Sequence, residues 1–212
     1  GLPGYVVVVL IMQLLWWFGI HGPNVMSAVT TPFMTKMMAT NLELYQAGEG
    51  VTASGVFYTA GSKYSIIANP FASGWFSSTG SGITMGLIVA IMLFSKRDDF
   101  KAIAKLAIPC GLFNINEPII FGIPMVMNAM FAVPFFLAPV ACVCCGYLVQ
   151  SLGLCPLFVI DVPWTTPVGL FGFLASSGNI MGGIWQIVII VGVSTLIYTP
   201  FVIAANRQTE EA

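Results

Sequence analysis

A carboxylate beside a helix breaker is the first feature of this sequence that could do chemistry. Glu117 lies in an apolar stretch, directly before Pro118 and shortly after Asn114 and Asn116. Pro118 removes a helical N–H donor and pushes Glu117 toward extended geometry, so backbone groups are freed, and the two amide side chains could satisfy them. A carboxylate in apolar surroundings needs a partner or a wet cavity, which favours a functional site. The structural alternative is pairing with a neighbouring helix, or a position at a water interface.

His21 is the second candidate, because it is the only histidine and follows an aromatic run. Histidine is the side chain best suited to exchanging protons near neutral pH. An interfacial position beside a Trp-rich belt explains the same residue equally well. Trp16 precedes His21 by five residues and projects in a different direction in a continuous helix. A site shared by Trp16 and His21 therefore requires the helix to unwind near Gly19.

A third candidate begins at Asp161, in the run Asp-Val-Pro-Trp-Thr-Thr-Pro. Its acidic residue, its two hydroxyls and the aromatic face of Trp164 are suited to a sugar, because indole faces pack on pyranose rings while polar groups fix orientation. The alternative is a loop that Trp164 anchors at lipid headgroups.

These candidates lie in a chain whose composition is typical of a membrane protein. Of 212 residues 58% are hydrophobic and 7% are charged, against roughly 25% charged in globular proteins. A net charge of −1 leaves no basic face for nucleic acid. The five cysteines lie in or beside apolar stretches, and the CxxC spacing of Cys142 and Cys145 is interpreted as small apolar filling. We expect no metal and no cofactor.

The apolar runs predict an all-α integral membrane protein with polytopic helices and two re-entrant broken-helix segments. A span needs about 20 apolar residues, and the expected spans are at about 2–20, 75–94, 125–150 and 183–204. Two short pieces interrupted by Gly and Pro, at about 106–124 and 161–178, predict the discontinuous helices typical of transporter binding sites. The mixed pattern over 30–45 predicts an interfacial or tilted helix.

The charges predict the orientation in the membrane. The expected loop 96–105 carries four cations, which are Lys96, Arg97, Lys101 and Lys105. The positive-inside rule makes this loop cytoplasmic. Two full crossings then return the chain to the same side, where Arg207 and the C-terminus lie, if the broken segments re-enter without crossing.

Three separated motifs resemble one family of bacterial sugar permeases. They are Asn-Ile-Asn-Glu-Pro-Ile-Ile-Phe-Gly-Ile-Pro within 113–127, Trp-Trp-Phe-Gly-Ile-His-Gly at 16–22, and Ser-Lys-Arg at 95–97. They resemble the membrane IIC component of the phosphoenolpyruvate-dependent phosphotransferase system, of the lactose/cellobiose/chitobiose type. The resemblance covers the whole chain, but only the C-terminal half of a family member.

The resemblance implies a phosphotransferase-coupled transporter in the bacterial cell membrane. A disaccharide binds within the membrane, and a phosphocysteine on a separate IIB phosphocarrier, itself charged by IIA, phosphorylates its 6-hydroxyl. The position of Glu117 matches the carboxylate that engages this hydroxyl, with His21 close by as a second catalytic residue. Trp16 and Trp164 match positions where the family places aromatic rings against the sugar. The other expected substrate-binding residues, from their own chemistry, are Asp161, Asn114 and Asn116.

The resemblance implies a homodimer for the full-length permease, with most of the dimer contact in the family's N-terminal half, which the resemblance does not cover. The sequence is also compatible with two other functions. One is an ion- or proton-coupled sugar transporter that uses Glu117 and His21 as a relay. The other is a membrane subunit that transports nothing.

Overall fold

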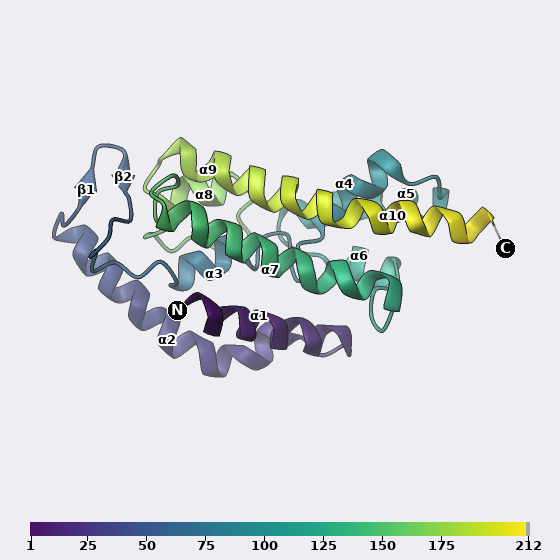
Figure 1. Cartoon of the computed structure of the whole chain (residues 1–212), viewed down its shortest axis with the longest axis horizontal. Coiled ribbons are helices and arrows are strands. Elements are labelled where there is room, and N and C mark those ends of the chain that lie inside the picture. The colour runs from purple at the N-terminus through teal and green to yellow at the C-terminus, as the bar shows by residue number, and fades with distance from the viewer. Residues whose placement is uncertain (211–212) are drawn as a thin grey trace.

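The computed structural model describes the backbone of residues 1–210 and the side chains of residues 1–207. The molecule is elongated and its described part is mostly helical (Figure 1). The helices are α1 (Leu2–Trp17), α2 (Gly22–Gln46), α3 (Asn69–Trp75), α4 (Met85–Phe94), α5 (Asp98–Leu112), α6 (Glu117–Gly122), α7 (Ala129–Ser151), α8 (Leu170–Ala175), α9 (Ile180–Ile187), the π-helix η1 (Val188–Val193) and α10 (Ser194–Glu210). A two-stranded hairpin joins β1 (Val51–Thr52) to β2 (Gly55–Val56).

Among the described residues, two helical stretches are long and apolar enough to cross a membrane. They are Ala129–Ser151 and Ile180–Arg207, with mean hydropathies of 2.1 and 2.3. The two run side by side along the molecule (Figure 1). They coincide with the expected spans at 125–150 and 183–204. The other two expected spans contain shorter apolar helices, Leu2–Trp17 and Met85–Phe94.

The expected helix over 75–94 is wrong in its first half. Residues 76–84 form an irregular turn segment between α3 and α4. Thr79 and Ile83 have φ of 63° and 50°, and two glycines of the same segment are also left-handed. Left-handed residues interrupt a right-handed helix, so only Met85–Phe94 is helical here.

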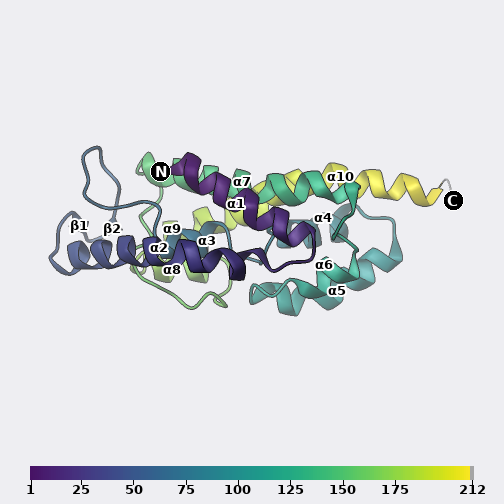
Figure 2. The same cartoon turned by 90° about the horizontal axis from the view of Figure 1, so that it is seen from below.

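The first broken segment lies where it was expected, although its first helix begins earlier. Residues 96–105 were expected as a loop, but α5 begins at Asp98. Asp98 and Asp99 occupy its first turn, where negative charge favours a helix N-terminus. The break at 113–116 separates α5 from α6, and Figure 2 shows α6 lying along α5.

The second broken segment consists of an extended loop over 160–169 followed by the short helix α8. Membrane re-entry of the two segments stays a prediction.

The helix expected over 30–45 is part of α2, which begins at Gly22 and runs back along α1 (Figure 1). Only Gly22 and Asn41 of its 25 residues are buried. A Cβ at Gly22 would lie 2.0 Å from the Met12 carbonyl oxygen, so glycine allows α2 to start directly against α1.

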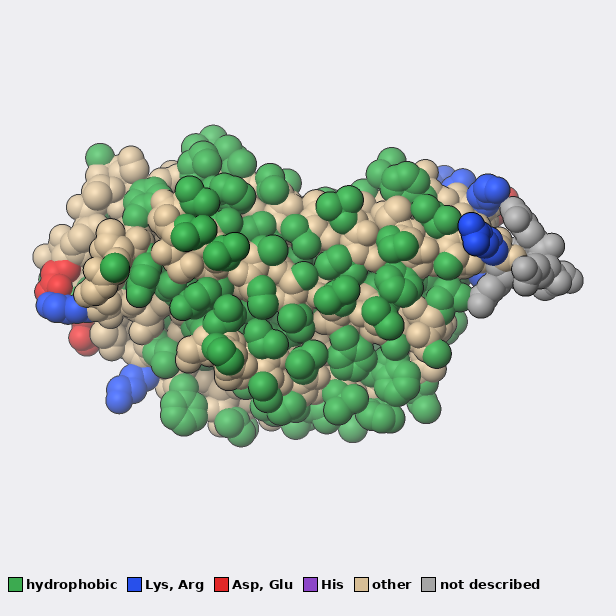
Figure 3. All heavy atoms as spheres, viewed as in Figure 1, with side chains coloured by type: hydrophobic (Ala, Val, Ile, Leu, Met, Phe, Trp, Pro, Cys, Tyr) green, Lys and Arg blue, Asp and Glu red, His purple; other side chains and the backbone are tan. Residues whose placement is uncertain are grey.

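The surface separates apolar from charged side chains along the long axis. On the face shown in Figure 3, hydrophobic side chains cover the middle and the charged side chains gather at the two ends. This distribution matches a molecule whose middle lies in hydrocarbon and whose ends lie in water.

Candidate functional site

Three interruptions of helical structure meet at the buried amide of Asn114. The backbone N–H of Thr79 donates to Asn114 Oδ1 at 2.6 Å. Asn114 Nδ2 in turn donates to the carbonyl oxygens of Trp164 and Thr166, the latter at 2.9 Å. The first broken segment, the 76–84 turn and the 160–169 loop are therefore joined at one side chain. The sequence predicted that this amide satisfies freed backbone groups; the groups it binds belong to two other segments.

Asn116 holds the same turn from a second point. Its Nδ2 donates to the Ser81 carbonyl oxygen, and its side chain is 4% exposed. Gly80 has a φ of +78°, and a Cβ there would lie 2.2 Å from Asn116 Cγ. The break at 113–116 can approach the turn this closely only because residue 80 has no side chain.

A third amide, Gln186 in α9, fixes the far end of the 160–169 loop. Gln186 Oε1 accepts from the backbone N–H groups of Gly169 and Gly172, both at 2.8 Å. Its Nε2 donates to the Gly74 carbonyl at 3.0 Å and to Ser78 Oγ at 3.1 Å. Sequence reasoning missed Gln186. An amide alone in an apolar stretch was the available signal, because it needs hydrogen-bonding partners there.

His21 and Trp16 are brought together because the chain unwinds between them. Helix α1 ends at Trp17, and Gly19 has a φ of +80°. The centroids of the Trp16 and His21 rings are 4.8 Å apart, so the unwinding near Gly19 that a shared site requires is present. The backbone N–H of Asn24 donates to His21 Nδ1 at 3.2 Å, so the neutral imidazole carries its proton on Nε2.

This aromatic pair is connected to the helix that begins with Glu117. The rings of Trp16 and Phe121 lie 6.5 Å apart between centroids, and Phe121 is one turn after Glu117 on α6. The Met127 N–H also donates to the Trp17 carbonyl at 3.1 Å, which ties the chain after α6 to the end of α1.

The Glu117 side chain is half-buried in this region. Within residues 1–207, no hydrogen bond or ion pair engages its carboxylate, so none joins it to His21.

The two aromatic candidates differ in access. Trp164 is 57% exposed, whereas Trp16 is 4% exposed and packed between His21 and Phe121. In this conformation only Trp164 presents a free face.

Among the described residues, no hydrogen bond or ion pair joins Asp161 to Glu117. Its Oδ1 accepts from Asn69 Nδ2 at 3.1 Å, and it lines a hollow of about 460 Å³ together with Tyr45 and residues at the end of α8.

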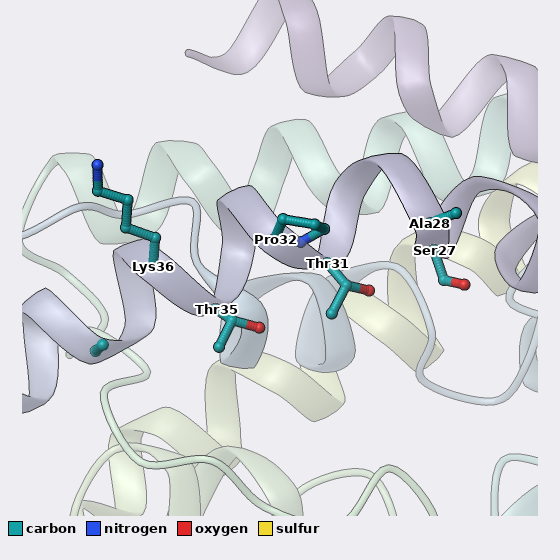
Figure 4. A pocket seen from close by; sticks show the side chains of 7 residues that line it. Ser27, Ala28, Thr31, Pro32, Thr35 and Lys36 are labelled. Carbon is teal, nitrogen blue, oxygen red and sulfur yellow. The ribbon is translucent and has the colours of Figure 1, made fainter.

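A second hollow lies apart from every expected site residue. A groove of about 610 Å³ follows the outer side of α2 around Pro32. Ser27, Thr31 and Thr35 point to one side of the helix, and Lys36 points to the other side (Figure 4).

The cationic segment and the last helix meet at one end of the molecule. Asn206 of α10 accepts from the Lys96 N–H at 2.9 Å and donates to the Phe94 carbonyl at 3.0 Å. The two basic regions expected on one side of the membrane are thus adjacent. Arg97 Nη2 lies 2.6 Å from Asp99 Oδ2, and this hydrogen bond holds the pKa of Asp99 below its usual value.

Two candidate spans among the described residues, together with helices broken at buried polar side chains, are features that membrane transporters share. Residues 1–139 match the family model described as "Phosphotransferase system, EIIC". The chain belongs to this family of sugar-permease components.

Two curated relatives and one solved structure agree with this family. The chain is 36% identical to the "PTS system cellobiose-specific EIIC component" of Lactococcus lactis subsp. lactis (strain IL1403), covering 96% of this chain and 43% of the relative. It is 34% identical to the "PTS system oligo-beta-mannoside-specific EIIC component" of Bacillus subtilis (strain 168), covering 98% and 44%. The crystal structure of the transporter ChbC, the IIC component from the N,N'-diacetylchitobiose-specific phosphotransferase system, superposes with a TM-score of 0.87 at 33% identity, over 98% of this chain and 45% of that chain. The chain thus spans less than half the length of these relatives.

Proposed function

We propose that this chain supplies the sugar-binding part of a permease that carries a β-linked disaccharide across the bacterial cell membrane. Uptake is coupled to phosphorylation of the sugar's 6-hydroxyl by a phosphocysteine on the IIB phosphocarrier. The observation that carries the proposal is the junction at Asn114, which joins the broken segment bearing Glu117 to the loop bearing Trp164. The names of the cellobiose and oligo-β-mannoside relatives support the β-linked class of sugar.

Glu117 is the proposed acceptor of the hydroxyl proton. Phosphoryl transfer depends mostly on positioning and charge stabilisation, and a carboxylate orients the attacking hydroxyl. The half-buried Glu117 carboxylate has no competing hydrogen bond among the described residues, so it is available for this role. In the neutral form of His21 the N–H group is at Nε2, and it can donate a hydrogen bond to a sugar hydroxyl or to the incoming phosphate.

The sugar rings are proposed to pack on tryptophan. Trp164 offers a free face, and Trp16 becomes a second platform if a sugar displaces part of its contact with His21. Asp161 borders the hollow beside Tyr45 and is proposed to bind hydroxyls where the sugar enters.

The proposed topology places the two broken segments as re-entrant pieces that stop within the membrane. The breaks at 113–116 and 160–169 meet each other through Asn114, as segments that end at a common depth would. The segment 96–105 and the C-terminal helix are proposed to face the cytoplasm, where the phosphocarrier is. The complete permease, with the family's preceding half, is expected to be a homodimer.

Glu117→Gln tests the proposal, because it removes the proton acceptor while keeping the shape of the side chain. General-base catalysis contributes about 100-fold or more to rate, so phosphorylation-coupled uptake of cellobiose should fall by at least about 100-fold. The measurement is uptake of cellobiose into liposomes that hold the complete permease, with phosphorylated IIB phosphocarrier supplied. Glu43→Gln, at an exposed position of α2, is the matched control and should retain the wild-type rate. A Glu117→Gln protein as active as the control would refute the role of Glu117.

A further inference from the structure

We infer that Asn114 is a positioning residue, which sets where Trp164 stands relative to Glu117 without contacting the sugar itself. This inference rests on the proposed function, and it departs from the sequence-based expectation that Asn114 binds substrate. It follows from the hydrogen bonds of the amide, from the backbone at residue 114 and from the surroundings of the Trp164 ring.

The Asn114 amide has no N–H group left for a sugar hydroxyl. Its Nδ2 carries two protons, and the carbonyls of Trp164 and Thr166 accept both. Its Oδ1 accepts from the Thr79 N–H at 2.6 Å, and the residue is 5% exposed. A sugar could use Nδ2 only by breaking a buried hydrogen bond, which leaves a carbonyl without a partner.

The Trp164 ring depends on its backbone for its position. Within residues 1–207, no hydrogen bond and no contact with another ring hold the indole, which is 57% exposed. The hydrogen bonds from Asn114 to the carbonyls of residues 164 and 166 are what fix this part of the loop. Because Asn114 lies three residues before Glu117, this amide links the backbone beside the proposed proton acceptor directly to the backbone of the proposed sugar platform.

The backbone at residue 114 allows the amide to be removed without strain. Asn114 has a φ of +67°, in the left-handed region that glycine adopts freely and asparagine tolerates. Asn114→Gly therefore keeps the turn and deletes the three side-chain hydrogen bonds. Asn116→Gly is the matched control, because among the described residues the Asn116 side chain hydrogen-bonds to the Ser81 carbonyl in the 76–84 turn and to no residue of the Trp164 loop.

The test is a double-mutant cycle between Asn114→Gly and Trp164→Ala in the intact protein, with KM and kcat measured for phosphorylation-coupled uptake of cellobiose. Asn114→Gly should raise KM about tenfold, equivalent to about 1.4 kcal/mol, with kcat changed less than twofold. In the Trp164→Ala background the same substitution should change KM less than twofold, because the platform it positions is gone. Asn116→Gly should have the same effect in both backgrounds.

An equal rise in KM in both backgrounds would overturn the inference, since Asn114 would then act independently of Trp164. A fall in kcat at unchanged KM would overturn it too. If Asn114→Gly does not fold, as judged by thermal unfolding in detergent, Asn114→Asp takes its place, because it keeps the acceptor for Thr79 and lacks both donors.

The same double-mutant cycle can be measured without the phosphocarrier, as the dissociation constant of cellobiose determined by calorimetry. If these constants show that the effects of Asn114→Gly and Trp164→Ala depend on each other, while the wild-type protein shows no phosphorylation-coupled uptake, only the proposed function is refuted. Coupled uptake without the cycle's signature would refute only the role of Asn114.

Discussion

Gln186→Leu is the substitution whose consequence can be worked out most fully from the structure. Leucine has a similar size, but it cannot accept the N–H groups of Gly169 and Gly172, which begin α8. The Gly74 carbonyl also accepts a hydrogen bond from Ser78 Oγ at 2.8 Å, so it keeps a donor when Gln186 Nε2 is lost. Two buried N–H groups therefore lose their acceptor.

Each unsatisfied buried group costs about 1–3 kcal/mol, which gives a total cost of about 2–6 kcal/mol for the two. The buried leucine returns about 1.5–3 kcal/mol of apolar transfer energy. Taking the middle of each range, we expect a net loss of about 2 kcal/mol in the free energy of unfolding. The KM for the disaccharide should rise too, because the end of the loop before α8 loses its hydrogen bond to Gln186.

The free energy of unfolding can be measured by detergent-induced unfolding of the protein in mixed micelles. Gln46→Leu, at the exposed end of α2, is the matched control and should change stability by less than about 0.5 kcal/mol. A Gln186→Leu protein as stable as this control would show that the four hydrogen bonds of Gln186 do not hold α8 in place.

Two further substitutions test packing and charge. A Cβ at Gly86 would lie 2.1 Å from Ser194 Oγ and 2.5 Å from the backbone of α10, so Gly86→Ala should lower the free energy of unfolding by about 1–3 kcal/mol. Gly4→Ala is the control, because a Cβ at Gly4 would have nothing within 4 Å. Equal melting temperatures of the two variants would contradict the close packing of α4 against α10. Asp99→Asn should cost less than about 1 kcal/mol at pH 7, because its pair with Arg97 is exposed. Since the hydrogen bond from Arg97 lowers the pKa of Asp99, the stabilisation is present above the unfolded pKa of about 3.9 and disappears as the pH falls below it. A difference between wild type and Asp99→Asn that grows on acidification would contradict this sign.

The positions of the helix breaks could be predicted from the sequence because local chemistry determines them. The break expected beside Pro118 lies at 113–116, but the expected extended geometry of Glu117 is wrong, because Pro118 is tolerated in the first turn of α6 and Glu117 begins that helix. Gly19 follows the end of α1 with a positive φ, and His21 lies beside Trp16. The glycines and prolines around Trp164 likewise predict an interrupted segment, and the loop over 160–169 has this form.

The 76–84 turn could not be predicted, because its conformation depends on residues far along the chain. Thr79 and Ile83 are left-handed although neither is glycine. The turn is held by Asn114 and Asn116, 35 residues away from their partners in sequence. Local hydrophobicity therefore indicated a helix where tertiary hydrogen bonds impose a turn.

The partners of the buried amides were beyond sequence reasoning for the same reason. Asn114 was noticed because it stands beside Glu117, but its bonds reach the carbonyl of Trp164, 50 residues later. Gln186 had no neighbouring motif to draw attention to it.

The central claim is that sugar enters only as it is phosphorylated. The most direct measurement supplies the intact protein in liposomes with doubly labelled substrates, one label on cellobiose and one on the phosphoryl group of the IIB phosphocarrier. The expected result is one phosphoryl group, on the 6-hydroxyl, for every disaccharide that enters, and no accumulation without charged phosphocarrier. Accumulation of unmodified cellobiose in the absence of the phosphocarrier would contradict the proposed function.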